Sequence, residues 1–327
     1  MSTRRISVVV AVLASMILAT TSCVQSDETT HDVFDNPDST PGFSLPDQPR
    51  VVALGWSDGA IAVELGVTPV AIYDWMGFGE ASKGVGEWDA AAVGTTPQLI
   101  SAQSAGDFNM QEIEEFDPDL ILNVRAKADS DITANLRKIA PVVTAPEGTG
   151  DYAVNWKTQT ELIGAALGKS DEADTLVTET TDAQQTVRSE HPEFADKRFV
   201  YGAKFGTAYG AYLAGDARFD FFSELGFVQN PPVTQLQSSG FFAQVPVERV
   251  GDLDAQVAVF TTIGLPFTEL ENDTLINSLA VVREDRAVRL PEDDPAIQAL
   301  AAGTPKSLRF ALDRITPQLT AATANVQ

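Results

Sequence analysis

Short apolar runs alternate with stretches of helical periodicity from residue 50 onward. Four β-branched or aliphatic runs in the first half predict strands at 51–54, 69–72, 120–122 and 141–143. The segments between them predict short helices, the first of them capped by Ser57, at 57–64, 113–116 and 132–139. Strands that alternate with helices through short loops favour a mainly parallel sheet that is covered on both faces.

The middle of the chain breaks this rhythm with two consecutive helical segments. The first covers 156–167 and ends at Gly168, and the second runs from its expected cap, Ser170, to His191. The second would be roughly 30 Å long at 1.5 Å per residue, which is long for a helix that crosses over one sheet. We expect it to be a rigid spacer between two lobes.

Strands and helices alternate again beyond this spacer. We expect strands at 199–201, 211–213, 257–260 and 287–290, and a closing helix over 308–319. The sequence therefore predicts an α/β fold of two lobes with mainly parallel sheets, joined by one long rigid helix. In order, we expect a signal peptide, an acidic tether, a first lobe, connecting helices and a second lobe, at residues 1–22, 23–49, 50–152, 153–192 and 193–327.

The first 22 residues have the pattern of a signal peptide. Arg4 and Arg5 precede an apolar run of 14 residues, 6–19, that is too short to span a bilayer. Small residues follow, and then Cys23, the only cysteine of the chain. This arrangement resembles a bacterial lipoprotein signal, although Thr20 stands where that pattern has leucine. Cys23 is the predicted lipid attachment site, and the alternative is a soluble secreted protein with an incidental thiol.

Composition narrows the possible partners. Residues 24–49 are rich in Asp, Ser, Thr and Pro, so we expect an extended polar tether in which His31 is solvated. The formal net charge of −24 disfavours nucleic acid and anionic lipid headgroups as partners. One cysteine cannot form a disulfide within the chain, and no second apolar stretch approaches membrane length. Any attachment to a membrane therefore depends on Cys23.

Five segments, taken in order, resemble the substrate-binding proteins of ABC importers for ferric siderophores, haem and cobalamin. They are 50–72, 108–124, 156–178, 245–260 and 279–290, and together they extend over most of residues 50–319. The tripeptides Tyr73-Asp74-Trp75 and Gly86-Glu87-Trp88 favour the siderophore branch of that family. The resemblance implies a monomer that binds its ligand in the cleft between its lobes and makes only small closing motions.

The resemblance also implies docking on a membrane permease through one acidic residue on each lobe. Glu248 occupies the position in the second lobe. Gln111 occupies the position in the first lobe, and the adjacent Glu112 would point about 100° further round a helix. The alternative for both glutamates is ordinary solvated surface.

A ferric siderophore requires aromatic walls and a few cationic donors. The best cation is Arg125, which directly follows the expected strand 120–122, because ligands collect at the carboxyl ends of strands in open α/β sheets. The alternative is a surface arginine that pairs with Asp129 or Asp131. Further candidates, each also compatible with a structural role, are Trp75, Lys83, Trp88, Lys204, Tyr209, Tyr212 and Phe242.

The chain lacks the side chains that several other chemistries need. His191, at the end of the spacer, is the only histidine in the expected lobes, so a histidine-rich metal site or a Ser-His-Asp triad is disfavoured. We predict a non-enzymatic carrier without a cofactor, lipid-anchored on the outer face of the cell membrane, which delivers a ferric siderophore to an ABC permease. One alternative is a haem or cobalamin carrier, in which Tyr209 or Tyr212 is a candidate axial ligand of haem. The other alternative is a secreted cell-envelope hydrolase.

Overall fold

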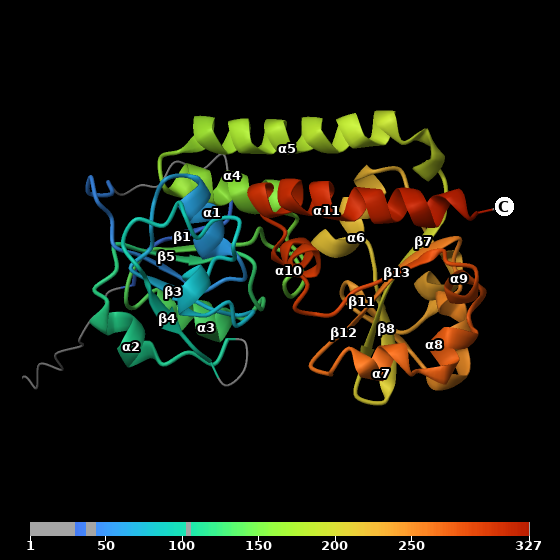
Figure 1. The fold of residues 1–327 in the computed structure, drawn as a ribbon. Coiled ribbons are helices and arrows are strands. Elements are labelled where there is room, and N and C mark those ends of the chain that lie inside the picture. The colour runs from blue at the N-terminus through green and yellow to red at the C-terminus, as the bar shows by residue number, and fades with distance from the viewer. Residues whose placement is uncertain (1–29, 37–43, 103–105, 327) are drawn as a thin grey trace, which may run out of the picture.

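The computed structural model describes residues 30–36, 44–102 and 106–326. Two α/β lobes lie side by side, and the long helix α5 (Ser170–Glu190) runs across both of them (Figure 1). The predicted signal peptide and Cys23 lie outside the described residues. None of the described helices is long and apolar enough to cross a membrane.

The first lobe is built on a six-stranded parallel sheet with the order β1-β6-β5-β2-β3-β4. Adjacent residues such as Val51 and Val52 bury their side chains in different apolar clusters, one on each face of this sheet. Its strands are β1 (Val33–Phe34), β2 (Val51–Ala53), β3 (Ala71–Tyr73), β4 (Gln98–Ile100), β5 (Leu120–Asn123) and β6 (Val142–Thr144). Its helices are α1 (Asp58–Glu64), η1 (Glu80–Ser82), α2 (Met110–Glu115), α3 (Ser130–Leu136) and α4 (Trp156–Ala166).

Part of the predicted tether belongs to this sheet. Val33 and Phe34 pair in parallel with Val142 and Val143 at the sheet edge. Phe34 is buried, and the backbone of His31 exchanges hydrogen bonds with Arg137. The expectation of an unpacked tether therefore does not hold for residues 30–36, because a single apolar pair is enough to extend an open parallel edge.

The second lobe contains a mixed sheet with the order β10-β11-β8-β7-β12-β13, and β9 also pairs with β7. Its antiparallel part begins where Gly206 turns β7 back into β8, with a positive φ of 54° that suits glycine. The strands are β7 (Arg198–Phe205), β8 (Ala208–Tyr212), β9 (Val228–Gln229), β10 (Ser238–Ser239), β11 (Phe242–Val245), β12 (Val257–Thr262) and β13 (Ala287–Arg289). The predicted class, two α/β lobes joined by a long helix, is confirmed, with antiparallel pairing confined to this second sheet.

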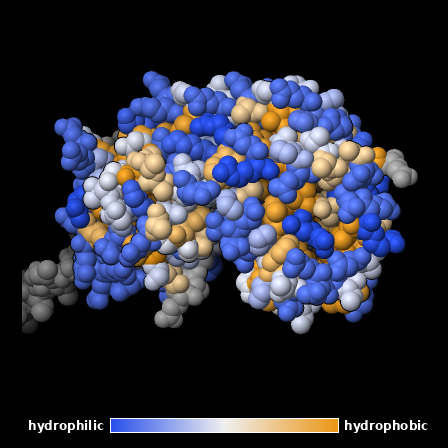
Figure 2. Space-filling view, viewed as in Figure 1, coloured by the Kyte–Doolittle hydropathy of each residue, from blue (hydrophilic) through white to orange (hydrophobic). Residues whose placement is uncertain are grey.

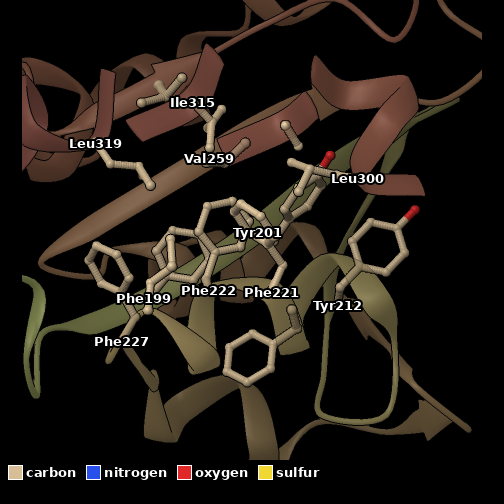
Figure 3. Packing of buried hydrophobic residues seen from close by; sticks show 14 of the residues in the cluster. Phe199, Tyr201, Tyr212, Phe221, Phe222, Phe227, Val259, Leu300, Ile315 and Leu319 are labelled. Carbon is tan, nitrogen blue, oxygen red and sulfur yellow. The ribbon is translucent and has the colours of Figure 1, made fainter. Parts of the chain in front are cut away.

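One face of this sheet carries a large aromatic core. Phe199, Tyr201, Tyr212 and Phe222 pack with their rings in contact beneath aliphatic residues of α10 and α11 (Figure 3). The covering elements of the lobe are η2 (Pro192–Phe194), α6 (Ala217–Glu224), η3 (Pro231–Gln235), η4 (Val247–Leu253), α7 (Thr268–Glu271), α8 (Thr274–Ser278), α9 (Ala280–Arg283), α10 (Pro295–Ala302) and α11 (Pro305–Ala324).

Two helices connect the lobes. The spacer α5 begins at Ser170, which lies inside the helix rather than capping it, and it packs on α4 and α11. Helix α11 is longer than expected and begins in a capping box formed by Thr304 and Ser307. Its first turn also touches the first lobe, because Lys306 N donates to Glu64 Oε2 at 3.0 Å. The lobes are therefore fixed along a broad contact rather than by the spacer alone.

Candidate functional site

A cavity of about 940 Å³ lies between the lobes. The space-filling view shows an indentation between the lobes on the side away from α5 (Figure 2). Among the described residues, four lining residues come from the first lobe, and all of them follow β2 or β3: Trp56, Trp75, Met76 and Gly77. The second lobe contributes the remaining wall, which includes Tyr201, Tyr212, Arg218, Phe241, Phe242, Thr261, Thr262, Phe267, Glu292 and Asp293.

Three aromatic rings are stacked in the first lobe, and two of them, Trp56 and Trp75, line the cavity. Trp56 lies between Tyr152 and Trp75, with ring centroids 4.1 Å and 4.4 Å away and interplanar angles of 21° and 8°. Trp56 follows β2 and Trp75 follows β3, so both lie beyond the carboxyl ends of parallel strands, where ligands collect in such sheets. A flat aromatic surface is thereby presented to the cavity.

Asp58 holds this wall in place from behind. Its carboxylate accepts hydrogen bonds from Val124 N at 2.7 Å, Arg125 N at 3.3 Å and Gln159 Nε2 at 2.7 Å. Burial raises the pKa of Asp58 to about 6 despite these hydrogen bonds, which favour the charged form. The preceding Ser57 has a φ of 65° and caps nothing, contrary to the expectation, because the chain turns sharply here to bury Asp58.

Arg125 crosses from the first lobe to the second. Its Nη1 donates to the carbonyl oxygens of Ala301 and Ala302 at 3.1 Å and 3.0 Å, at the end of α10. Its Nη2 lies 3.7 Å from Asp216 Oδ2, and only 2% of the side chain is exposed. Burial lowers the pKa of Arg125 to about 10, so it remains charged at neutral pH. Arg125 is therefore a link between the lobes and is not among the residues that line the cavity.

The alternative partners of Arg125 have other roles. Asp129 caps α3 by accepting hydrogen bonds from the backbone of Asp131 and Ile132. The observed partner of Arg125, Asp216, is distant in the sequence and comes from the other lobe. Sequence spacing alone offers no signal for such a pair.

Asp216 joins Arg125 to a second arginine that does line the cavity. Arg218 Nε and Nη2 donate to the two oxygens of Asp216 at 2.6 Å and 2.8 Å. The Arg218 guanidinium lies 3.8 Å from the centroid of the Tyr212 ring, and its Nη1 donates to the Tyr212 hydroxyl. Burial alone would raise the pKa of Asp216, but Arg218 and Arg125 hold it below its ordinary value. The carboxylate therefore stays charged and is shared by the two arginines.

The predicted ligand residues of the second lobe lie on both faces of its sheet. Tyr212 and Phe242 line the cavity, and their ring centroids are 4.9 Å apart. Tyr209 lies three positions before Tyr212 on the same strand and therefore faces the opposite side of the sheet. There its hydroxyl donates to Asp273 Oδ2, which also accepts from Lys204 Nζ at 2.6 Å. Tyr209 and Lys204 thus belong to the far side of the sheet and not to the cavity wall.

Two predicted residues of the first lobe also lie away from the cavity. Lys83 Nζ donates to the carbonyl oxygen of Val93. Trp88 packs edge-on against Phe78 and contacts Phe310 of α11, so it belongs to the contact between the lobes. Of the predicted ligand residues, the structure brings Trp75, Tyr212 and Phe242 together around the cavity.

Sequence reasoning missed Trp56 and Arg218. Trp56 carried a usable signal, because it follows the apolar run of β2 just as Trp75 follows β3. Arg218 carried none, because it lies in the first turn of α6 and reaches the cavity only through its contacts with Asp216 and Tyr212.

The predicted docking residues lie on two separate short helices. Gln111 is exposed on α2, and the adjacent Glu112 is half-buried, as their different directions on a helix require. Glu248 is exposed on η4 of the second lobe. Within the described ranges, no group of three or more His, Cys, Asp or Glu side chains is placed to hold a metal ion.

Comparison with known proteins places this fold in a family. A sequence profile of the family described as periplasmic binding protein matches residues 51–292. The chain therefore belongs to the periplasmic binding proteins. No curated protein sequence matches it.

Solved structures share the two-lobed fold. A periplasmic solute binding protein from Mycobacterium smegmatis is 26% identical, with a TM-score of 0.75 over 91% of this chain and 100% of its own. PiaA from Streptococcus pneumoniae, solved in complex with ferrichrome, is 20% identical, with a TM-score of 0.71 over 91% of this chain and 100% of its own. Staphylococcus aureus SirA, complexed with staphyloferrin B, is 20% identical, with a TM-score of 0.67 over 86% of this chain and 96% of its own.

Proposed function

We propose that the protein captures a ferric siderophore in the cavity between its lobes and delivers it, unaltered, to an ABC permease. The observation that carries this proposal is a cavity of about 940 Å³ with aromatic side chains from both lobes. Its size and its mixture of rings with a few polar groups suit a bulky metal chelate. Similar structures solved with ferrichrome and staphyloferrin B support the same ligand class.

Anchoring and docking complete the proposal. Cys23 carries lipid and holds the protein on the outer face of the cell membrane. Glu248 and the Gln111–Glu112 position engage basic residues of the permease, one on each lobe. Trp75, Tyr212 and Phe242 contact the chelate, and Arg125 fixes the lobe geometry around it.

Tryptophan fluorescence tests the ligand class. The purified protein is titrated with a panel of ferric siderophores, haem and cobalamin. A bound ferric siderophore should quench the emission of Trp75, so Trp75→Phe should reduce the quenching amplitude. Trp88→Phe is the matched control and should retain it, because Trp88 packs against α11. Absence of binding by every ferric siderophore, or a Soret band with haem alone, would refute the proposal.

Charge reversal tests the docking role. Glu248→Lys should lower siderophore uptake by cells by about tenfold while leaving ligand affinity intact, because η4 lies apart from the cavity lining. Glu190→Lys on α5 introduces the same charge change at an exposed position of the spacer. Equal uptake by the two variants would remove Glu248 from the docking role.

A further inference from the structure

The charges around the cavity are not those of an anion-binding site. Arg218 is the one cationic side chain among the lining residues of the described chain, and Glu292 and Asp293 are its anionic ones. Counted as formal charges, the lining therefore has an excess of negative charge. The chain as a whole, at −24, has the same sign.

The cationic groups near the cavity are already paired with buried carboxylates. Arg218 forms a two-point ion pair with Asp216, and only 12% of its side chain is exposed. Arg125 is held between Asp216 and the carbonyl oxygens of α10. On the other face of the sheet, Lys204 is bound to Asp273. Arg125 and Arg218 share one buried carboxylate, Asp216, so one positive charge is left over among these described groups, fewer than the two negative charges of Glu292 and Asp293.

The anionic groups at the rim are not compensated in the same way. Glu292 and Asp293 are exposed and form no ion pair with a lysine or arginine in the described part of the chain. Glu292 Oε2 accepts a hydrogen bond from Gly264 N at 2.7 Å, which fixes this carboxylate near the loop that follows β12. An anionic ligand would meet these two carboxylates, which outnumber the one positive charge left over.

The remaining polar groups of the wall are uncharged. Thr262 Oγ1 and Tyr201 Oη are buried and have no hydrogen-bond partner among the described residues. Together with the rings of Trp75 and Phe242, they make a surface suited to amide and hydroxamate groups rather than to a dense cluster of negative oxygens.

We propose that this cavity selects ferric chelates without net negative charge, and therefore ferric tris-hydroxamates over ferric tris-catecholates. Three hydroxamates, each with one negative charge, neutralise Fe³⁺, whereas three catecholates, each with two, leave a charge of −3. This selectivity rests on the proposed siderophore-binding function and assigns its substrate class. The fold comparisons do not decide the matter, because similar folds bind different chelates.

The test compares two ferric complexes with the same protein. Ferrichrome, an uncharged tris-hydroxamate, should bind at least about tenfold more tightly than a ferric tris-catecholate such as ferric enterobactin at low salt. Raising NaCl from about 0.05 M to about 0.5 M should strengthen any binding of the catecholate, because salt screens repulsion, and should change ferrichrome binding little.

A variant pair locates the origin of the selectivity. The double substitution Glu292→Gln with Asp293→Asn removes the rim charges and keeps an acceptor for Gly264 N. It should raise the ratio of catecholate to ferrichrome affinity at least about fivefold. Asp174→Asn with Asp182→Asn removes the same formal charge from exposed positions of α5 and should leave that ratio unchanged.

Each possible result supports or overturns the proposed selectivity. Equal or tighter binding of the catecholate, catecholate binding that weakens with salt, or an affinity ratio that the rim variant leaves within twofold would overturn the selectivity while leaving siderophore capture intact. Failure of both complexes to bind would also overturn the selectivity, whereas the proposed function itself is refuted only when every ferric siderophore of the panel fails to bind.

Discussion

The two lobes contribute to the cavity in different ways. The first lobe presents one stack of rings, backed by the buried Asp58 and by an all-parallel sheet. The second lobe supplies most of the lining, from both parallel and antiparallel strands of its mixed sheet. The comparison suggests that the first lobe provides a rigid flat surface, whereas the second lobe determines the shape and charge of the site.

Asp216 is where the two lobes depend on each other most. It is fully buried, pairs with Arg218 in its own lobe, and faces Arg125 from the other. Asp216→Ala would leave two buried guanidinium groups without their counter-ion, and we expect it to lower the free energy of unfolding by about 3–5 kcal/mol. Chemical denaturation measures this loss.

Asp129→Ala is the matched control for that variant. Asp216 caps α6 by accepting a hydrogen bond from Arg218 N, and Asp129 likewise caps α3, but at an exposed position and without a buried arginine as partner. It should therefore destabilise the protein much less. If the two variants lose similar stability, the Arg125–Asp216–Arg218 cluster has no special role in joining the lobes.

The second prediction compares how much each wall of the cavity contributes to ligand affinity. Phe242 supports Tyr212 and contacts Phe205, so Phe242→Ala should remove part of the wall and loosen its neighbour. We expect ferrichrome affinity to fall by about tenfold, the equivalent of about 1.4 kcal/mol. Titration monitored by fluorescence measures this change.

Trp75→Ala provides the corresponding change in the first lobe. Trp56 lies directly behind Trp75 and would still offer a flat ring to the ligand. The loss should therefore be smaller, about threefold. A larger loss of affinity for Trp75→Ala than for Phe242→Ala would mean that the first lobe, and not the second, contributes more to ligand binding.

The sequence was sufficient for the architecture because the fold follows from periodicity. Short apolar runs such as 51–54 and 120–122, alternating with helical segments, are typical of a sheet covered on both faces, and the predicted helix 170–191 is long enough to identify the spacer. The antiparallel part of the second sheet was missed because β11 was not predicted as a strand and the apolar pattern of β8 does not reveal its direction.

The site was predicted less completely, for a physical reason. Trp75, which was a candidate, lines the cavity, and its position after a strand is a signal that would also have found Trp56. Arg125 also follows a strand, but its guanidinium joins the two lobes. Its partner, Asp216, lies 91 positions further along the chain, so the sequence offers no sign of this pair. Which face a residue takes, as for Tyr209 and Tyr212, needs a strand register that local sequence does not provide.

A second contact between the lobes contains a pair of carboxyl groups. Asp89 Oδ1 lies 3.2 Å from Lys306 Nζ, and Glu64 Oε2 accepts from Lys306 N. Glu64 Oε1 and Asp89 Oδ2 are buried and receive no hydrogen bond from a nitrogen donor in the described chain. A proton on Glu64 would allow it to donate to Asp89. Burial, and then the charge of Asp89, raise the pKa of Glu64 well above its ordinary value.

This carboxyl pair should change how the stability of the protein depends on pH. Because the pKa of Glu64 is raised on folding, the folded protein binds more protons than the unfolded chain above about pH 4.5, and this contribution to stability is lost as pH rises through the folded pKa. Glu64→Gln should flatten that decline by up to about 1.4 kcal/mol per pH unit, as measured by denaturation at a series of pH values. Glu115→Gln, exposed on α2, should retain the wild-type slope. An unchanged slope in Glu64→Gln would mean that the carboxyl pair shares no proton.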